Sequence, residues 1–327
     1  MLKECYLGVD VGSVSTNIIL IDEEDNILLK KYIRTQGKPI EILQNGLGEI
    51  KKELGDLSIK GVGATGSGRY LASMILGADV VKNEITSHAV ASIKYVPDVR
   101  TILEIGGQDS KIILLRDGVV TDFAMNTVCA AGTGSFLDRQ ASRLDIQIQE
   151  FGMLALKSKN PVRIAGRCAV FAESDMIHKQ QLGHNQEDIV RGLCEALVRN
   201  YLNNVGKGKE ILDSVVFQGG VAANAGIKKA FEDVLNTSVL IPEHFDVMGA
   251  IGVALLAKEE IKVKGKTSFR GLGISDVPYK VKGSECGDCS NMCEVIEIVA
   301  NNSIIARYGD KCGKWTGQLT ASNKNLA

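Results

Sequence analysis

The chain has 327 residues, of which 45% are hydrophobic and 24% are charged, and its formal net charge is −1. So balanced a charge provides no basic surface for nucleic acid or for an anionic membrane, and we expect neither as a partner. No apolar run approaches the roughly 18 residues that cross a bilayer, and no apolar signal segment precedes the first strand-like stretch, so we expect a cytoplasmic protein. The length favours one two-lobed α/β body with a small appendage.

The first half of the chain contains two copies of one pattern, in which a strand, a glycine loop, a second strand, a turn and a third strand follow one another. The strands of the two copies are expected at 5–10, 17–21 and 27–33, and at 101–105, 111–115 and from 119 onward. Helical periodicity is found at 40–54, 134–144 and 187–202. The repeat predicts two lobes with a shared plan.

The domain boundaries follow from this repeat and from changes in composition. The two-lobed body is expected at 1–260, with the first lobe at about 1–95 and 236–260 and the second at about 96–235. From 261 to 282 the sequence is basic and contains glycine without clear periodicity, which is typical of a linker. Residues 283–327 hold four cysteines and are expected to form a small cysteine-rich module.

The first glycine loop follows the first strand and contains Asp10. Glycine lets the backbone approach phosphate oxygens, while amide N–H groups and hydroxyls donate hydrogen bonds to them. A carboxylate at this position can hold magnesium-bound water. The phosphate-binding residues of this loop are expected to be Gly12, Ser13, Ser15 and Thr16.

The second loop supplies the same chemistry from the second copy, with Gly106 and Gly107 as its phosphate-binding glycines. Two facing hairpins could clamp a triphosphate, so we predict a site for ATP and Mg²⁺ between the lobes. The catalytic residues are expected to be Asp10 with Glu104 or Asp109, which would position magnesium and water, and Gln108, which would orient the water.

Two further features complete the expected nucleotide site. Gly219 and Gly220 form a strand-to-helix turn before Asn224, where the missing side chains would let an adenine or a ribose lie against the backbone. The small-residue run 248–254 is typical of a tightly packed helix and would suit a hinge. The order of hairpin, hairpin, Gly-Gly turn and small-residue helix resembles the actin, sugar kinase and heat-shock ATPase superfamily, an α/β fold built from a duplicated RNase H-like unit. Walker-type and Rossmann signatures are absent.

Two cysteines, Cys129 and Cys168, each precede an apparent helix. Two helix amino termini directed at one point would stabilise a thiolate-ligated, negatively charged cluster. Buried inert thiols are the alternative. A four-iron cluster takes four cysteines, so a homodimer with the site on its twofold axis would complete the set.

The stretches 129–138 and 168–174 closely resemble the ATP-dependent activators of 2-hydroxyacyl-CoA dehydratases, and the ATPase subunits of benzoyl-CoA reductases look similar; both are ATPases of the BadF/BadG/BcrA/BcrD type. The resemblance covers about residues 7–256 and includes 64–66, 84–88, 105–109 and 219–222. It implies a homodimeric ATPase with one [4Fe-4S] cluster between its subunits, ligated by Cys129 and Cys168 of each chain. ATP hydrolysis would then drive an electron from ferredoxin or flavodoxin to an iron–sulfur dehydratase or reductase, or to an enzyme with a double-cubane cluster.

One position departs from this resemblance, because Asn17 stands where many members carry lysine after the hydroxyl residues of the first loop. A phosphate contact would then be missing. Lys111 on the facing hairpin could contribute charge, but we expect it to be a solvated lysine at a strand end.

The C-terminal cysteines form a second group, in which a β-like stretch at 293–307 could fold back and bring the last cysteine near the others. A module of this size has little core without a metal, and four thiols can bind zinc or an iron–sulfur cluster, which both stay open here. The expected ligands are Cys286, Cys289, Cys293 and Cys312. Cys5 and Cys194 are expected to be ordinary core residues.

Two other functions share parts of this pattern. A small-molecule kinase of the same superfamily, such as an amino-sugar kinase, would use the same nucleotide elements and would need a catalytic aspartate, for which Asp122 is the candidate. Such a kinase would not need Cys129 or Cys168. An actin-like or chaperone-like assembly protein would need filament or peptide-binding segments, which we do not find.

Overall fold

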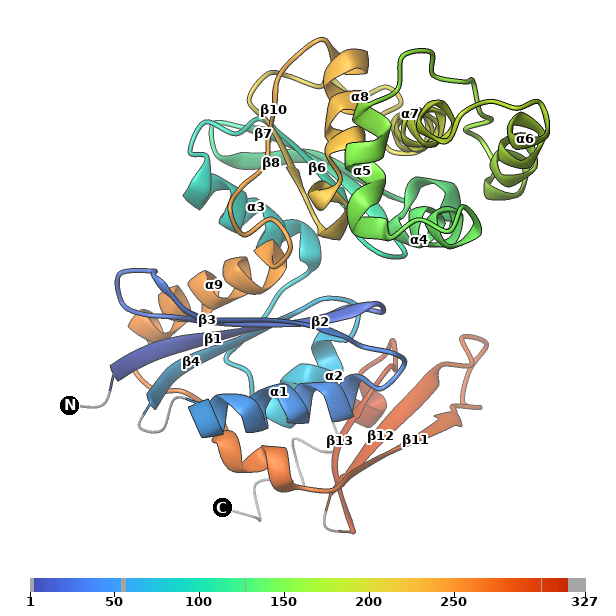
Figure 1. The fold of residues 1–327 in the computed structure, drawn as a ribbon. Helices are drawn as coiled ribbons and strands as arrows, with labels where there is room; N and C mark the ends of the chain where they lie inside the picture. The colour runs from blue at the N-terminus through green and yellow to red at the C-terminus, as the bar shows by residue number, and fades with distance from the viewer. Residues whose placement is uncertain (1–2, 54–56, 127, 301, 317–327) are drawn as a thin grey trace.

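The computed structural model describes residues 3–53, 57–126, 128–300 and 302–316. Figure 1 shows two lobes, with two helices between them and a small third sheet beside the first lobe. In the described residues the sheets have the strand orders β3-β2-β1-β4-β5, β10-β9-β6-β7-β8 and β11-β12-β13. The first two sheets repeat one plan, with an antiparallel three-strand meander followed by two parallel strands, so the predicted duplication is present.

The first lobe is a sheet covered on both faces. Its strands are β1 (Lys3–Val11), β2 (Ser15–Ile21), β3 (Ile27–Arg34), β4 (Leu57–Thr65) and β5 (Val80–Val81). Helices α1 (Pro39–Glu53) and α2 (Arg69–Leu76) pack on one face, where alternate residues of β1, including Leu7 and Val9, join their core. Helix α9 (Met248–Lys264) covers the other face (Figure 1). A Cβ on Gly8 would lie 1.9 Å from the Ala250 carbonyl oxygen, so glycine permits this close contact.

The second lobe has the same layers but more helices. Its strands are β6 (Thr101–Ile105), β7 (Ser110–Arg116), β8 (Val119–Asn126), β9 (Val215–Gln218) and β10 (Val239–Leu240). Its main core lies between this sheet and a group of helices, and the 134–144 and 187–202 patterns correspond to two of them, α4 and α7. These helices are α4 (Gly134–Arg143), α5 (Ile148–Leu156), α6 (Ala169–Gln181), α7 (Gln186–Asn204) and α8 (Ala225–Leu235).

Helices α3 (Glu84–Tyr95) and α9 form the contact between the lobes. A Cβ on Gly252 of α9 would lie 1.8 Å from the Ser87 carbonyl oxygen of α3. The small-residue run therefore does form a tightly packed helix. Ile85 of α3 packs with apolar residues of β6, β7 and β9, so α3 lies on the second sheet, although 1–95 was expected in the first lobe. Similarly, β10 pairs with β9, although 236–260 was also expected in the first lobe.

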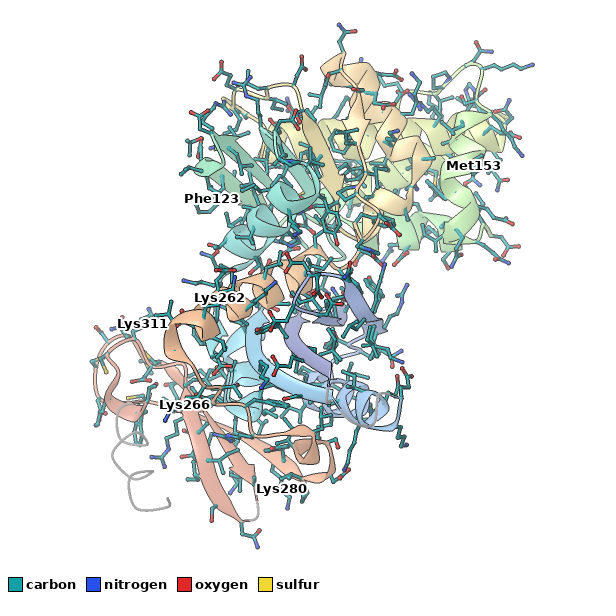
Figure 2. All side chains as sticks on the ribbon, turned by 90° about the vertical axis from the view of Figure 1, so that its left-hand side faces the viewer. Phe123, Met153, Lys262, Lys266, Lys280 and Lys311 are labelled. Carbon is teal, nitrogen blue, oxygen red and sulfur yellow. The ribbon has the colours of Figure 1, made fainter. Side chains whose placement is uncertain are left out.

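The C-terminal part packs on the first lobe through Ile298 and Ala306. It comprises a 3₁₀ turn, η3 (Leu272–Asp276), and the strands β11 (Tyr279–Glu285), β12 (Glu294–Ala300) and β13 (Ser303–Tyr308). The end of α9, η3 and the start of β11 thus lie within 261–282, where a linker was expected. In Figure 2, Lys280 and Lys311 mark this region, whereas Phe123 and Met153 mark the second lobe. Of the expected module 283–327, residues 301 and 317–327 lie outside the described residues.

No helix among the described residues is both long enough and apolar enough to cross a bilayer.

Candidate functional site

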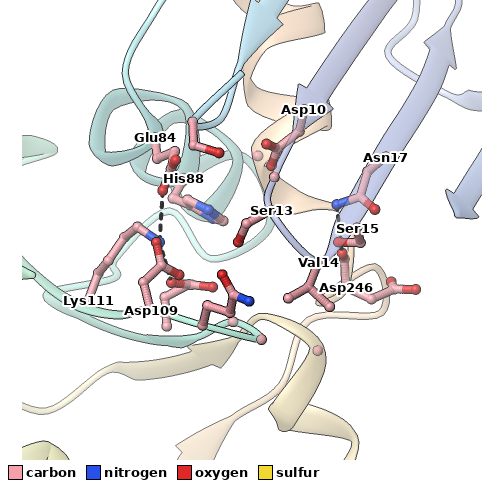
Figure 3. Close-up of a pocket in the computed structure, with 18 of the residues that line it drawn as sticks. Asp10, Ser13, Val14, Ser15, Asn17, Glu84, His88, Asp109, Lys111 and Asp246 are labelled. Atoms are coloured by element: carbon pink, nitrogen blue, oxygen red, sulfur yellow. Dashed lines mark hydrogen bonds and ion pairs between the residues drawn. The ribbon is translucent and has the colours of Figure 1, made fainter. Parts of the chain in front are cut away.

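A cavity of about 250 Å³ opens between the lobes where the two hairpin loops face each other (Figure 3). The loops meet at Val14 and Gly107, and a Cβ on Gly107 would lie only 2.5 Å from Val14 Cγ2. Glycine is therefore required for this approach. The predicted residues that line the cavity are Asp10, Gly12, Ser13, Ser15, Glu104, Gly106, Gly107, Gln108, Asp109 and Gly220.

Asp10 lies near the end of β1 and is enclosed by two glycines. A Cβ on Gly249 would lie 2.2 Å from Asp10 Oδ2, and a Cβ on Gly66 would lie 2.4 Å from Oδ1. Burial raises the pKa of Asp10 to about 7, and the neighbouring Glu84 charge adds to this shift while Lys111 opposes it. A divalent cation in the cavity would favour the ionised form, so Asp10 is suited to bind magnesium or its water.

Lys111 is the centre of a charge cluster in the wall of the cavity. Its Nζ lies 2.8 Å from Glu84 Oε2, 3.0 Å from Glu104 Oε2 and 2.9 Å from Asp109 Oδ2, and its side chain is only 2% exposed. The expectation of a solvated lysine was wrong. Alternate strand residues share a face, and Ile113 of the same strand packs with α3, so the Lys111 side chain runs along that face to the amino end of α3.

The carboxylates around Lys111 differ in their protonation. Burial raises the pKa of Glu104 to about 8, despite the opposing charge of Lys111. Burial would also raise the pKa of Glu84, but the charge and hydrogen bond of Lys111 outweigh it and the pKa is lowered. Glu84 is thus ionised at neutral pH. No role was predicted for it, although the resemblance at 84–88 and the cap at Asn83, whose side chain accepts from the Thr86 N–H, mark this helix start.

His88 and Gln218 are two further buried polar residues for which the sequence predicted no role. Gln218 Nε2 lies 2.8 Å from His88 Nδ1, and Gln218 Oε1 accepts a hydrogen bond of 2.8 Å from Ser92 Oγ. This arrangement makes Gln218 the donor to Nδ1 and leaves the proton of His88 on Nε2. Burial, aided by the Lys111 charge, lowers the pKa of His88 to about 3. The cavity wall therefore holds a neutral imidazole.

A second cavity of about 350 Å³ adjoins the first, and both are lined by Val14, Gly106, Gly107 and Gly220. Asn224 lines it and caps α8 by accepting from the Ile227 N–H at 3.1 Å. Tyr32 belongs to the first lobe and lines both cavities. The first cavity is rich in carboxylates and glycines, so it suits phosphates with a metal, and the second has the room and the apolar walls for a nucleoside.

The cysteines of the second lobe lie close together behind the phosphate loop. Cys168 is the N-cap of α6, and Arg167 directly precedes it. Cys129 Sγ lies 3.8 Å from the Arg167 carbonyl oxygen. Both thiols are half-buried. Cys129 leads into a 3₁₀ turn, η1 (Ala130–Gly132), and α4 begins only at Gly134. The sequence predicted that Cys129 would stand at the amino terminus of an α-helix. Instead, the short 3₁₀ turn η1 separates Cys129 from α4.

The model of the BadF/BadG/BcrA/BcrD ATPase family matches residues 7–257. The chain belongs to this family. It is 35% identical over 265 residues to the 2-hydroxyisocaproyl-CoA dehydratase activator of Clostridioides difficile, covering 80% of this chain and 97% of that relative. It is also 35% identical over 261 residues to the (R)-2-hydroxyglutaryl-CoA dehydratase activating ATPase of Acidaminococcus fermentans, covering 77% and 96%.

The fold agrees with solved structures of this family. The structure of the 2-hydroxyisocaproyl-CoA dehydratase activator from Clostridium difficile with bound ADPNP matches with a TM-score of 0.73 at 34% identity, covering 80% of this chain and 97% of that one. The resemblance stated from the sequence is confirmed, and so is the two-lobed α/β ATPase fold.

Two of the predicted nucleotide-binding residues lie away from the cavities, and Asn17 lines one of them. Thr16 and Gly219, expected to bind the cofactor, are not among the described residues that line the two cavities. Thr16 Oγ1 lies 3.0 Å from Thr35 Oγ1 in the interior, and Gly219 has a φ of +87° and packs against β6. Asn17 does line the cavity; its Nδ2 lies 3.5 Å from the Asp246 carbonyl oxygen, and its buried Oδ1 has no partner among the described residues.

The remaining cysteines fall into two groups. Cys5 and Cys194 are buried in the cores of the lobes, as expected. In the C-terminal sheet the Cys286 N–H donates to the Cys293 carbonyl oxygen at 2.8 Å, which brings the ends of β11 and β12 together, while Cys289 and Cys312 are exposed. Over the part of the chain that the structure describes, no three His, Cys, Asp or Glu side chains are arranged to hold a metal ion. A zinc or iron–sulfur site in this module stays a prediction.

Proposed function

We propose that this family member is an ATP-hydrolysing iron–sulfur electron-transfer protein that activates a partner enzyme. The partner would be a 2-hydroxyacyl-CoA dehydratase, a benzoyl-CoA reductase-like enzyme or an enzyme with a double-cubane cluster. The names of the relatives support this, and they include a subunit of the benzoyl-CoA reductase of Thauera aromatica at 28% identity. The observation that carries the proposal is the proximity of Cys129 to the Cys168 loop in the lobe that also holds Lys111 and the second phosphate loop.

The nucleotide cavity supports ATP hydrolysis with magnesium. In the described residues it is lined by five carboxylates and a single cationic side chain, Lys111. A polyanionic triphosphate can enter such a site only with a metal cation that compensates the charges. Asp10, with Glu104 or Asp109, would position the metal and its water, and Gln108 would orient the attacking water. The ionised Glu84, held by Lys111, is a further acceptor for a proton of that water.

The cysteine site fits half of a shared [4Fe-4S] cluster. One chain offers two half-buried thiols, whereas such a cluster takes four, so a second copy related by a twofold axis would supply the other two. The flanking side chains of Val128, Val170 and Phe171 are 95%, 67% and 66% exposed, and such an apolar surface suits burial against that second copy. When bound, the cluster would accept and donate one electron at low potential. The amino end of α6 would stabilise its negative charge at Cys168.

ATP would act by biasing the angle between the lobes. The nucleotide contacts loops of both lobes, whereas both cysteines belong to the second lobe alone. A change of lobe angle would therefore move the cysteine site and the surface around it. We expect the electron to come from ferredoxin or flavodoxin and the protein to act in the cytoplasm as a homodimer.

The candidate catalytic base of a kinase, Asp122, does not lie at the nucleotide site. Asp122 lies exposed on β8 and pairs with Lys209 Nζ at 2.5 Å. It is not among the described residues that line either cavity between the lobes. The family assignment also favours an activator, so we do not favour a kinase.

Iron analysis of the anaerobically purified protein tests the proposal. We expect about four iron atoms per dimer and an electron paramagnetic resonance signal after reduction that changes when ATP is added. Cys129→Ser should lose the iron and the signal but still bind ATP. Cys194→Ala, at a buried thiol away from the site, is the matched control and should keep both. Wild-type protein without iron under strict anaerobiosis would refute the electron-transfer function.

A further inference from the structure

Two neighbouring residues of α7 point to two different sites. Asn200 is 1% exposed and faces the cysteine loops, whereas Tyr201 is fully buried and faces the sheet. Tyr201 Oη donates a hydrogen bond of 2.6 Å to the Lys111 carbonyl oxygen on β7. Successive residues of an α-helix point about 100° apart, so one turn of α7 contacts both the strand of the nucleotide site and the cysteine site.

The amide of Asn200 connects the loops that carry the two cysteines. Its Nδ2 lies 2.6 Å from the Gly166 carbonyl oxygen, 3.3 Å from that of Arg167 and 3.6 Å from Cys129 Sγ. Its Oδ1 accepts a hydrogen bond of 2.8 Å from Asn204 Nδ2. Because Asn204 also donates to the Asn200 carbonyl oxygen, the oxygen of the Asn200 amide faces Asn204 and the nitrogen faces the cysteines.

The Asn200 side chain also restricts which residue can occupy position 132 of the Cys129 loop. A Cβ on Gly132 would lie 2.7 Å from Asn200 Oδ1, so the backbone of η1 runs against the amide. Asn126 holds the other end of this loop, since its Oδ1 accepts from the Cys129 N–H at 2.9 Å and its Nδ2 donates to the Cys129 carbonyl oxygen at 2.9 Å. Asn126 thus holds the backbone of Cys129, and Asn200 links this loop to the Cys168 loop.

A second connection joins this region to the phosphate loop. The Gly134 N–H donates to the Gly106 carbonyl oxygen at 2.9 Å, and Ser135 Oγ donates to that of Gly107 at 2.6 Å. Residues 134–135 begin α4, directly after the Cys129 loop. The cysteine loops are thus bonded to the second nucleotide hairpin on two sides, through α4 and through Tyr201 of α7.

We propose that Asn200 is a positioning residue that fixes the spacing of Cys129 and Cys168 and tunes the potential of the cluster they bind. The inference rests on the proposed electron-transfer function. A hydrogen bond from N–H to a ligand sulfur stabilises the extra negative charge of the reduced cluster and so raises its reduction potential. Asn200 is the buried donor in place for this at Cys129. Without it the cluster is harder to reduce.

The test compares the midpoint potential of the cluster in the intact dimer, by redox titration followed with electron paramagnetic resonance. Asn200→Leu and Asn200→Ala both remove the donor but change the packing in opposite directions, so a shift shared by both reports the lost hydrogen bond. We expect both potentials to be more negative than that of the wild type, with ATP hydrolysis retained. Asn203→Ala, at an exposed position of the same helix, is the matched control and should not shift.

The outcomes separate this inference from the proposed function. If either Asn200 variant keeps its iron and titrates at the wild-type potential, the role assigned to Asn200 is wrong while the electron-transfer function stands. If the wild type itself binds no iron, the proposed function fails first. Thermal unfolding of each variant checks the fold, and the smaller alanine variant provides the measurement if the leucine does not fold.

Discussion

The two lobes repeat one hairpin but carry different residues at its equivalent positions. In the first lobe Asp10 lies across from Asn17, and in the second Glu104 lies across from Lys111. The second hairpin therefore places a cation opposite its own carboxyl group, whereas the first leaves Asp10 facing the cavity without a cation across the strand pair. Duplication has thus provided two similar phosphate loops, of which the first is better suited to a metal and the second to a fixed charge network.

The lobes differ more in what joins their third and fourth strands. Among the described residues, α1 is the one helix between β3 and β4 of the first lobe, whereas in the second lobe the helices α4 to α7 lie between β8 and β9. Both Cys129 and Cys168 lie in this longer connection, as does Asn200. The shared plan thus accounts for nucleotide binding, and the additional helices of one lobe account for the proposed redox site.

The largest effect, on ATP hydrolysis, is expected at Asp10, which has no cation opposite it in the first hairpin. Asp10→Asn should lower ATP hydrolysis by at least about 100-fold, because an amide cannot replace an ionised carboxylate toward magnesium, while the iron content is unchanged. Steady-state phosphate release measures this. Glu104→Gln should lose less, since burial raises the pKa of Glu104 to about 8 and the neutral amide resembles its protonated form. Asp122→Asn is the control, and equal losses at Asp10 and Glu104 would contradict the unequal roles of the lobes.

The sequence predicted the repeated hairpins and most of the residues at the cavity, because two matching copies of a strand followed by a glycine loop are far more specific than one. It did not predict which strand residues face inward. Ser15 and Asn17 line the cavity while Thr16 points into the interior, and only the pairing of β1 with β2 fixes that alternation. The burial of Lys111 was missed for a related reason, because Glu84, which closes the cluster around it, lies on a helix that precedes the hairpin in the sequence.

The sequence could not show which lobe each helix joins, for a different reason. Helix α3 has buried residues that contact the second sheet and others that contact α9, so its periodicity alone does not say which lobe it joins. The C-terminal cysteines likewise have a spacing that predicts a metal, but the described side chains do not converge. In both cases the sequence pattern of a segment does not determine which neighbouring part of the protein the segment packs against.

A smaller effect, on stability, is expected from the charge network of the second lobe. Lys111→Met should lower the free energy of unfolding by about 3–5 kcal/mol, because it leaves buried carboxylates without a counter-charge. Urea unfolding of the nucleotide-free protein measures this, and calorimetry should also show weaker ATP binding. Lys258→Met is the matched control, since Lys258 is a buried lysine that pairs with Asp25 away from the cavity. It should destabilise the protein but leave ATP affinity intact; equal losses of affinity would contradict a specific role for Lys111.

The smallest effect concerns the buried imidazole beside this network. The pKa of His88 in the folded protein, about 3, lies below the ordinary value of 6.5, because burial and the Lys111 charge oppose protonation. The contribution of the neutral imidazole to stability is therefore fully present above about pH 6.5 and is lost as the pH falls toward 3. Between pH 7 and 5 the wild type should lose up to about 2 kcal/mol more of its free energy of unfolding than His88→Gln does.

Urea unfolding of the nucleotide-free protein at several pH values measures this difference in slope. His184→Gln, at an exposed histidine, should follow the wild-type slope. Parallel slopes for the wild type and His88→Gln would mean that His88 takes up its proton in the fold as readily as in the unfolded chain, which burial and the nearby Lys111 ammonium oppose. The second lobe would then hold a second cation at the cavity wall below about pH 6.5, in addition to Lys111.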